Sequence, residues 1–170
     1  MLTKKVENAL NRQIEMEGYA SNYYLSAASW CDSKGLEGAA GFLYGHADEE
    51  RMHMMKIFSY VNAAGGHAQA PSIKQPPTKF KSLKELFEAV FAHEIEVTKS
   101  INNLVDLCMH EKDHSSYNFL QWYVAEQHEE EKLFRNVLDK INLLGPDDSR
   151  GLYWIDRELA ALTAPPGAAK

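Results

Sequence analysis

The sequence predicts an all-α protein, a bundle of four long helices followed by a short fifth helix. Proline, which breaks helices, is absent from residues 1–70, and all six prolines lie within 71–77, at 146 and at 165–166. Apolar residues recur every three or four positions, and the alternation typical of strands is not sustained anywhere. A chain of 170 residues that is 45% hydrophobic is long enough for one domain with a sizeable core.

The first two helices are predicted to pair across a short turn. The first spans about residues 3–31, and its apolar stripe comprises Val6, Leu10, Ile14, Ala20, Tyr24 and Ala28. After a turn region at 33–38, the second helix spans about residues 36–64. It is expected to end at Gly65-Gly66, because glycine readily adopts the left-handed conformation that terminates a helix.

The third and fourth helices form a second predicted pair. Ser82 and Glu85 make a capping box at the start of the third helix, whose stripe runs to Cys108. The polar residues 110–115 break the pattern, and the fourth helix follows at about 115–143. Gly145-Pro146 is expected to stop it.

A fifth, shorter helix is predicted near the C-terminus. The residues Asp147, Asp148 and Ser149 could cap it, and one of its faces carries Leu152, Ile155, Leu159 and Leu162. The domain is therefore expected to cover residues 1–163, and residues 164–170 to form a disordered tail. We also expect a homo-oligomer, because this helix is too short to complete the bundle and its apolar face needs a partner.

Connection lengths predict the topology of the bundle. Short turns join the first helix to the second and the third to the fourth, so each pair should be an antiparallel hairpin. The connection at residues 67–80 is long and contains three prolines. It is expected to run the length of the bundle, which predicts a four-helix bundle with one crossover, between the second and third helices.

Charge and composition exclude several classes of function. The net charge of −6 argues against general binding of nucleic acid. No apolar run approaches the length of a membrane span, and no signal peptide is apparent at the N-terminus. The two cysteines, Cys31 and Cys108, fall on apolar stripes and are expected to be buried free thiols in a reducing cytoplasm.

Each long helix carries one glutamate on its apolar stripe, near the middle of the helix. These are Glu17, Glu50, Glu94 and Glu130, and His53 shares the face of Glu50 three residues away. Helix midpoints meet at one height in an antiparallel bundle, so the four carboxylates and the imidazole should converge in its centre.

Taken one at a time, these residues have ordinary explanations. A helical glutamate is usually solvated, and a buried histidine is more often a hydrogen-bonded core residue than a ligand. Burying four uncompensated carboxylates together would cost several kcal/mol each. Bound cations remove that cost, and oxygen ligands with one nitrogen suit iron(II) or manganese, with zinc as a competitor. The set therefore predicts a site for two divalent ions, with some carboxylates bridging them.

A second acidic cluster is predicted beside the first. Glu126, Glu129 and Glu130 share one face of the fourth helix, where like charges at spacings of three and four repel one another. Glu49 lies next to Glu50 but points about 100° away from it, and it could reach this cluster. A solvated acidic face and a further cation site are both open interpretations on spacing alone.

These motifs together resemble the bacterial non-haem ferritins over nearly the whole chain. The resemblance lies in Glu17 followed by Tyr24, in HADEERMHMMKIFSYV, in Glu94 within HEIE, in WYVAEQHEEE, and in the C-terminal LYWIDREL. It implies a 24-subunit cage in the cytoplasm that oxidises iron(II) with O2 or H2O2 and stores it as a ferric mineral.

The resemblance also implies roles for individual residues. Glu17, Glu50 and His53 would hold one iron, and Glu50, Glu94 and Glu130 the second. Gln127 would hydrogen-bond beside the centre, and Tyr24 and Trp122 are candidate electron donors. A third iron site would comprise Glu49, Glu126, Glu129 and Glu130.

Three related classes of protein are alternatives to a bacterial non-haem ferritin. A bacterioferritin would have a haem-ligating methionine directly after the bridging glutamate, where Arg51 stands, so haem is not expected. A rubrerythrin-type di-iron oxidase or peroxidase usually has Glu-x-x-His on two helices, and this chain has it on one. Miniature DNA-protecting ferritins place their iron site between subunits and often carry a basic tail, which is absent here.

Overall fold

The computed structural model describes residues 2–145 and 149–163, and within them it contains five α-helices and no strand. They are α1 (Lys4–Ser33), α2 (Glu37–Ala63), α3 (Leu83–His110), α4 (His114–Leu144) and α5 (Ser149–Thr163). The predicted bounds of the first four helices lie within two residues of these. The predicted capping by Asp147 and Asp148 and the predicted tail at 164–170 fall outside the described residues.

Local side-chain chemistry explains where the long helices begin. The hydroxyl of Thr3 accepts a hydrogen bond from the Val6 amide at 3.3 Å, which caps α1. Half of the predicted capping box at α3 is formed, since Ser82 accepts from the Glu85 amide. The Glu85 carboxylate accepts from the amide of Lys81, the residue before the N-cap. Gly65 ends α2 with a φ of 82°, a left-handed conformation that glycine adopts without strain.

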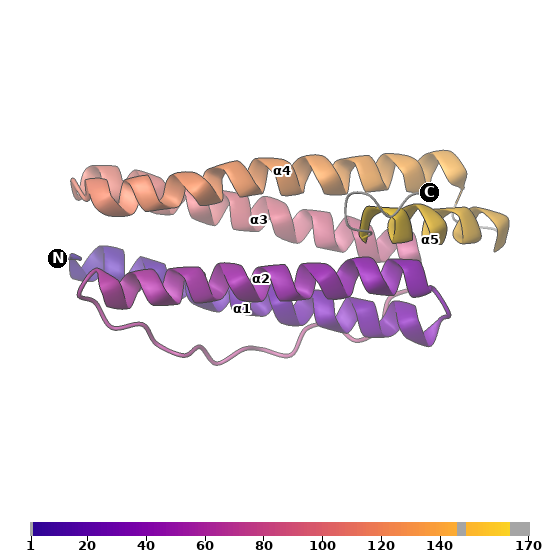
Figure 1. The fold of residues 1–170 in the computed structure, drawn as a ribbon, viewed down its shortest axis with the longest axis horizontal. Coiled ribbons are helices and arrows are strands. Elements are labelled where there is room, and N and C mark those ends of the chain that lie inside the picture. Colours follow the sequence, from indigo (N-terminus) through magenta and orange to yellow (C-terminus); the bar gives the residue numbers. More distant parts are fainter. Residues whose placement is uncertain (1, 146–148, 164–170) are drawn as a thin grey trace.

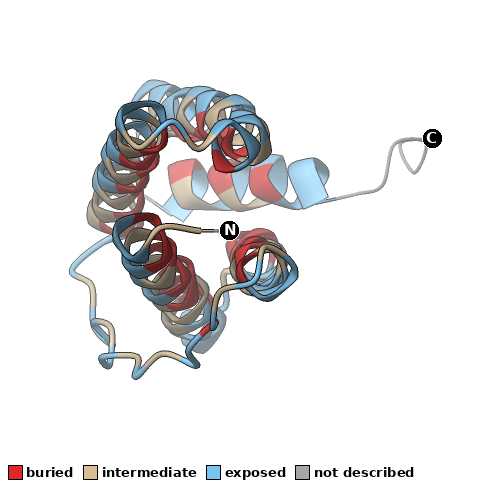
Figure 2. Ribbon diagram, turned by 90° about the vertical axis from the view of Figure 1, so that its left-hand side faces the viewer, coloured by how far each residue is buried: buried red, intermediate tan, exposed pale blue. Residues whose placement is uncertain are grey.

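The four long helices form two antiparallel hairpins, α1 with α2 and α3 with α4 (Figure 1). The connection from α2 to α3 runs along the length of the bundle, as predicted, so the fold is a four-helix bundle with one crossover. Buried residues line the helix faces that look toward one another (Figure 2). None of the described helices has a stretch long and apolar enough to span a membrane.

The core of the bundle is divided into two clusters. One is rich in aromatic residues and includes Tyr24, Phe87 and Phe134, and it extends to Ile155 and Leu159 of α5. The other lies toward the opposite end of the bundle and is mainly aliphatic. Glu17, Glu50, Glu94 and Glu130 belong to neither cluster and fall between them in sequence along every long helix. Both cysteines are buried and unpaired, as predicted.

The short helix α5 packs across one end of its own bundle, against α2 and α4. Ile155 and Leu159 are buried there, and the Asp156 carboxylate accepts a hydrogen bond from the Ala39 amide at 2.8 Å. The apolar face of this helix is therefore covered in part by α2 and α4 of the same chain, while Leu162 on that face remains 43% exposed. Tyr153 and Trp154, on the other side of α5, are about half exposed.

Gly38 allows α5 to approach α2 closely, and this gives a first prediction. A Cβ atom at Gly38 would lie 2.0 Å from the Asp156 carbonyl oxygen, a backbone atom that cannot yield without moving α5. Gly38→Ala is expected to lower the free energy of unfolding by about 1–3 kcal/mol, as overpacking does.

Gly41 provides the matched control, because it lies in the same helix and a Cβ there would meet nothing within 4 Å. Gly41→Ala should stabilise the protein by about 0.5–1 kcal/mol through its higher helix propensity. Chemical denaturation of both variants measures the difference. Equal stability of the two variants would show that α5 does not dock against Gly38.

Candidate metal centre

The four core glutamates and His53 meet in one buried layer of the bundle. Glu17, Glu50 and Glu94 are each 1% exposed, and His53 and Glu130 are also buried. One ligand atom from each of Glu17, Glu50 and His53 lies within 4.8 Å of the other two. The structure thus brings three of the predicted ligands, from α1 and α2, to a spacing that one metal ion can bridge.

Glu94 is oriented by two hydrogen bonds from other helices. The Tyr24 hydroxyl donates to one carboxylate oxygen at 2.5 Å, and the Gln127 amide donates to the other at 3.1 Å. Both donors were singled out in the sequence, and both act on this carboxylate. Each carboxylate oxygen has a second lone pair, so these bonds leave Glu94 able to bind a cation.

Two supporting contacts were not anticipated from the sequence. The Gln13 amide donates to Glu17 at 2.8 Å and in turn accepts from the Ser100 hydroxyl, which links α1 to α3. The Tyr123 hydroxyl donates to the His53 carbonyl oxygen at 2.8 Å. Gln13 lies four residues before Glu17 and Tyr123 seven before Glu130, so helical spacing could have revealed both.

Four buried side-chain atoms in the described residues have no hydrogen-bond partner. They are one oxygen each of Glu17, Glu50 and Glu130, and the Nδ1 atom of His46. Leaving a charged or polar group buried and unpaired costs free energy, so such groups are rare in native proteins. A cation is the partner that suits three carboxylate oxygens, so the residues present fit a metal site.

The ionisation of the cluster reflects its crowding. Burial and the charge of Glu50 raise the pKa of Glu17 well above its ordinary value, and burial and the charge of Glu94 do the same for Glu50. The same two causes, burial and the Glu94 charge, raise the pKa of Glu130 to about 8. Burial also raises the pKa of Glu94, but hydrogen bonds from Tyr24 and Gln127 oppose the rise. Without a cation, this layer therefore retains protons near neutral pH.

His46 is a buried residue of this region that the sequence interpretation missed. It lies on α2, and its ring stacks on Tyr24 at 5.4 Å and packs edge-on to Phe42 at 4.4 Å between ring centroids. Burial lowers its pKa to about 4, so its imidazole is neutral at physiological pH. His46 precedes His53 by seven residues, and that heptad spacing was the available signal.

The second acidic cluster lines an open groove between α2 and α4. The groove has a volume of about 570 Å³, and its walls include Glu49, Glu126, Glu129, Glu130 and His46. Ligand atoms of Glu49, His53 and Glu126 lie within 4.8 Å of one another, and so do those of His46, Glu49 and Glu130. Glu129 is exposed and belongs to no such group among the described residues.

Trp122 lies directly beside the centre. Its ring meets the His53 ring edge-on at 5.2 Å and the Tyr123 ring at 4.8 Å. The Lys56 ammonium nitrogen lies 3.2 Å from the centroid of the Trp122 ring. A cation in that position attracts the ring electrons and disfavours removing one of them.

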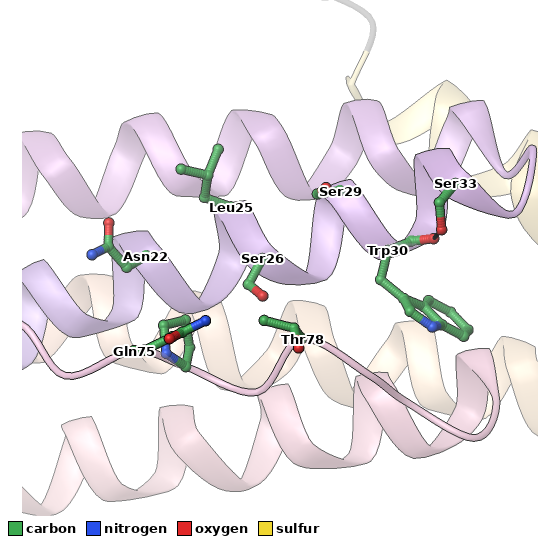
Figure 3. A pocket seen from close by; sticks show the side chains of 9 residues that line it. Asn22, Leu25, Ser26, Ser29, Trp30, Ser33, Gln75 and Thr78 are labelled. Atoms are coloured by element: carbon green, nitrogen blue, oxygen red, sulfur yellow. Dashed lines mark hydrogen bonds between the residues drawn. The ribbon is translucent and has the colours of Figure 1, made fainter.

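A second pocket, of about 460 Å³, lies on the outer side of α1 against the crossover (Figure 3). The crossover is held there by a hydrogen bond from the Ser26 hydroxyl to the Pro77 carbonyl oxygen at 2.6 Å. The lining residues are Asn22, Leu25, Ser26, Ser29, Trp30, Ser33, Gln75, Pro76 and Thr78. None of these is a carboxylate, histidine or cysteine, so this pocket does not offer a metal site.

Fold and donor set together define a ferritin-like protein. The sequence model of the ferritin-like domain family matches residues 7–144, most of the chain. A solved open-pore ferritin from the archaeon Archaeoglobus fulgidus superposes with a TM-score of 0.91 and is 44% identical, over 94% of this chain and 98% of that one.

Curated relatives narrow the family further. A bacterial non-heme ferritin of Campylobacter jejuni is 50% identical over 92% of this chain and 93% of its own length. A bacterial non-heme ferritin of Escherichia coli is 42% identical over 95% of this chain and 98% of its own. The chain belongs to the bacterial non-haem ferritins, a family of iron-storage proteins.

The crowded carboxylates predict how the metal-free protein responds to pH. A raised glutamate pKa in the folded state means that folding retains protons, so its contribution to stability is lost as pH rises through that pKa. Between pH 6.5 and 8.5, ordinary glutamates stay ionised and His46 stays neutral. The free energy of unfolding should therefore fall across this window.

Replacing Glu50 removes the charge that faces both Glu17 and Glu94. Glu50→Gln is expected to raise the stability of metal-free protein at pH 8 by about 1–3 kcal/mol, and by less at pH 6.5. Chemical denaturation in a chelator at both pH values measures this, with the exposed Glu15→Gln as control. A destabilised Glu50→Gln protein at pH 8 would contradict the argument.

Proposed function

We propose that the protein stores iron by oxidising iron(II) at the buried layer of Glu17, Glu50, His53, Glu94 and Glu130. The observation that carries this proposal is the set of three buried glutamate oxygens without hydrogen-bond partners. Iron(II) is the substrate, and its charge compensates the carboxylates that crowd one another in the metal-free layer. Glu17, Glu50 and His53 would bind one iron, and Glu50, Glu94 and Glu130 the second, with Glu50 bridging.

The residues of the centre then have distinct roles in oxidation. Each of two iron(II) ions gives up one electron, and together they reduce O2 to H2O2 or H2O2 to two waters, with two protons taken up in either case. Carboxylate oxygens favour the harder iron(III) product. Tyr24 and Gln127 hold Glu94 in place. Tyr24 and Trp122 are candidate donors of further electrons, and Lys56 would hold Trp122 in its reduced form.

A third iron site would lie in the groove, with Glu49, Glu126, Glu129 and Glu130 as ligands. The shared wall of the groove and the short spacing of Glu49 and Glu126 support this assignment. It would give iron a route between solvent and the centre. The mineral would grow in a hollow shell of 24 chains in the cytoplasm, without haem.

Loss of a predicted ligand tests the centre. His53→Ala and Glu50→Ala are each expected to slow the rapid phase of iron(II) oxidation in air by about 100-fold or more, because the paired site can no longer form. Stopped-flow absorbance of the ferric product measures the rate. His114→Ala, at the exposed start of α4, is the matched control and should oxidise iron at the original rate. An unchanged fast phase in His53→Ala would refute the assignment.

Assembly is tested separately. Large apolar side chains remain exposed on the single chain, among them Leu25, Trp154 and Leu143, and Leu25 lines the pocket on α1 (Figure 3). Such groups are commonly covered by contacts between chains. Analytical ultracentrifugation should give the mass of 24 chains for the native protein and for His53→Ala alike. A monomer or dimer would contradict the proposed shell.

A further inference from the structure

His46 has an environment that packing alone does not explain. The side chain is only 8% exposed, and its Nδ1 atom has no hydrogen-bond partner. That atom lies 3.7 Å from Glu49 Oε2 and 3.7 Å from Glu130 Oε2. These distances are too long for hydrogen bonds. Two ligands that each lie about 2.1 Å from one ion can be at most about 4.2 Å apart, and both distances from His46 Nδ1 are within that limit. Ligand atoms of all three residues lie within 4.8 Å of one another, so a small adjustment of the side chains would let them share an ion.

The ordinary alternative is a histidine that serves as one more ring of the aromatic cluster. Phe42, Tyr24 and Phe134 do contact the imidazole, with centroid distances of 4.4, 5.4 and 5.2 Å. A phenylalanine would pack against the same rings without burying an unpaired nitrogen. Packing therefore accounts for the ring but not for a nitrogen that faces two carboxylates.

The groups that face the His46 Nδ1 atom also favour a bound cation. Neither Glu49 nor Glu130 makes a hydrogen bond to the Nδ1 atom at 3.7 Å, so no protein group occupies the space between this nitrogen and the two carboxylates. The Glu130 oxygen that faces His46 is itself buried and unpartnered. One imidazole nitrogen and two carboxylate oxygens suit a divalent cation.

We propose that His46, Glu49 and Glu130 form a binding site for a divalent first-row cation, iron(II) or zinc(II), at the inner wall of the groove. The nitrogen ligand distinguishes it from the all-carboxylate third site proposed above, since imidazole favours borderline divalent ions over hard iron(III). The inference rests on the proposed function of the centre in one respect. Glu130 belongs to both sites, so an ion held by His46 competes with the second iron for this carboxylate.

The site can be tested with cobalt(II) as a probe on metal-free protein, by equilibrium dialysis and by visible absorption. His46→Phe preserves the ring contacts and removes the nitrogen. It is expected to bind one cobalt(II) fewer per chain, or to bind that ion at least tenfold more weakly, with a change in the ligand-field bands. His128→Phe is the matched control, because His128 lines the same groove but belongs to none of the ligand groups.

Two further variants separate the possible outcomes. If His46→Phe fails to fold, His46→Gln gives the same comparison with a side chain that keeps polarity and lacks the imidazole. His53→Ala reports on the centre independently. Unchanged stoichiometry, affinity and spectrum in both His46 variants would overturn the His46 site. If the His46 variants bind cobalt(II) normally and His53→Ala binds less, the His46 site fails and the proposed centre stands. If the His46 variants bind less cobalt(II) and His53→Ala binds the original amount, the centre fails and the His46 site stands.

Discussion

Four carboxylates buried at mid-height of a helical bundle are the constraint on which this structure depends. Each glutamate replaces a residue that would otherwise join the two hydrophobic clusters into one core. The pKa of Glu50 is raised because burial and the charge of Glu94 both penalise the ionised form. A bundle built for stability alone would place aliphatic side chains here. Cations bound in the layer would offset this cost, and iron(II) is the cation that the proposed function would supply.

The rest of the fold holds the layer in place while it lacks cations. The aromatic cluster on one side includes Phe134 and Phe87, and it is extended by α5. On the other side, Gln13 donates a hydrogen bond to Glu17 and accepts one from Ser100, which links α1 to α3 next to the site. Hydrophobic burial in two separate blocks thus offsets the unfavourable electrostatics between them. The crossover contributes indirectly, because it sets the helix directions that put all four midpoints at one level.

Much of this arrangement could be predicted from the sequence, because helical periodicity carries the information. Glu94 occurs where its stripe requires an apolar residue, and the same holds for Glu17, so convergence followed from topology. Contacts between side chains of different helices were harder to predict. That Tyr123 reaches the His53 carbonyl depends on the rotation of α4, which periodicity does not specify. His46 resembled one more core position, since spacing cannot tell a packed ring from a nitrogen without a partner. The docking of α5 on its own bundle depends on Gly38, whose role appears only when the Asp156 carbonyl is seen against it.

The layer is not symmetric, and its asymmetry gives the site a direction. On the α3 side, both oxygens of Glu94 accept hydrogen bonds, from Tyr24 and Gln127, so protein groups fix the orientation of this carboxylate and leave each oxygen one lone pair for a cation. Glu17, Glu50 and Glu130 each keep an oxygen without a protein partner, and of these three Glu130 is the one that lines the open groove between α2 and α4. Groups that must exchange ligands cannot be fully committed to fixed hydrogen bonds. If iron binds at this layer as proposed, the groove between α2 and α4 is the expected route for ions to enter and leave, while Glu94 on α3 keeps a fixed orientation.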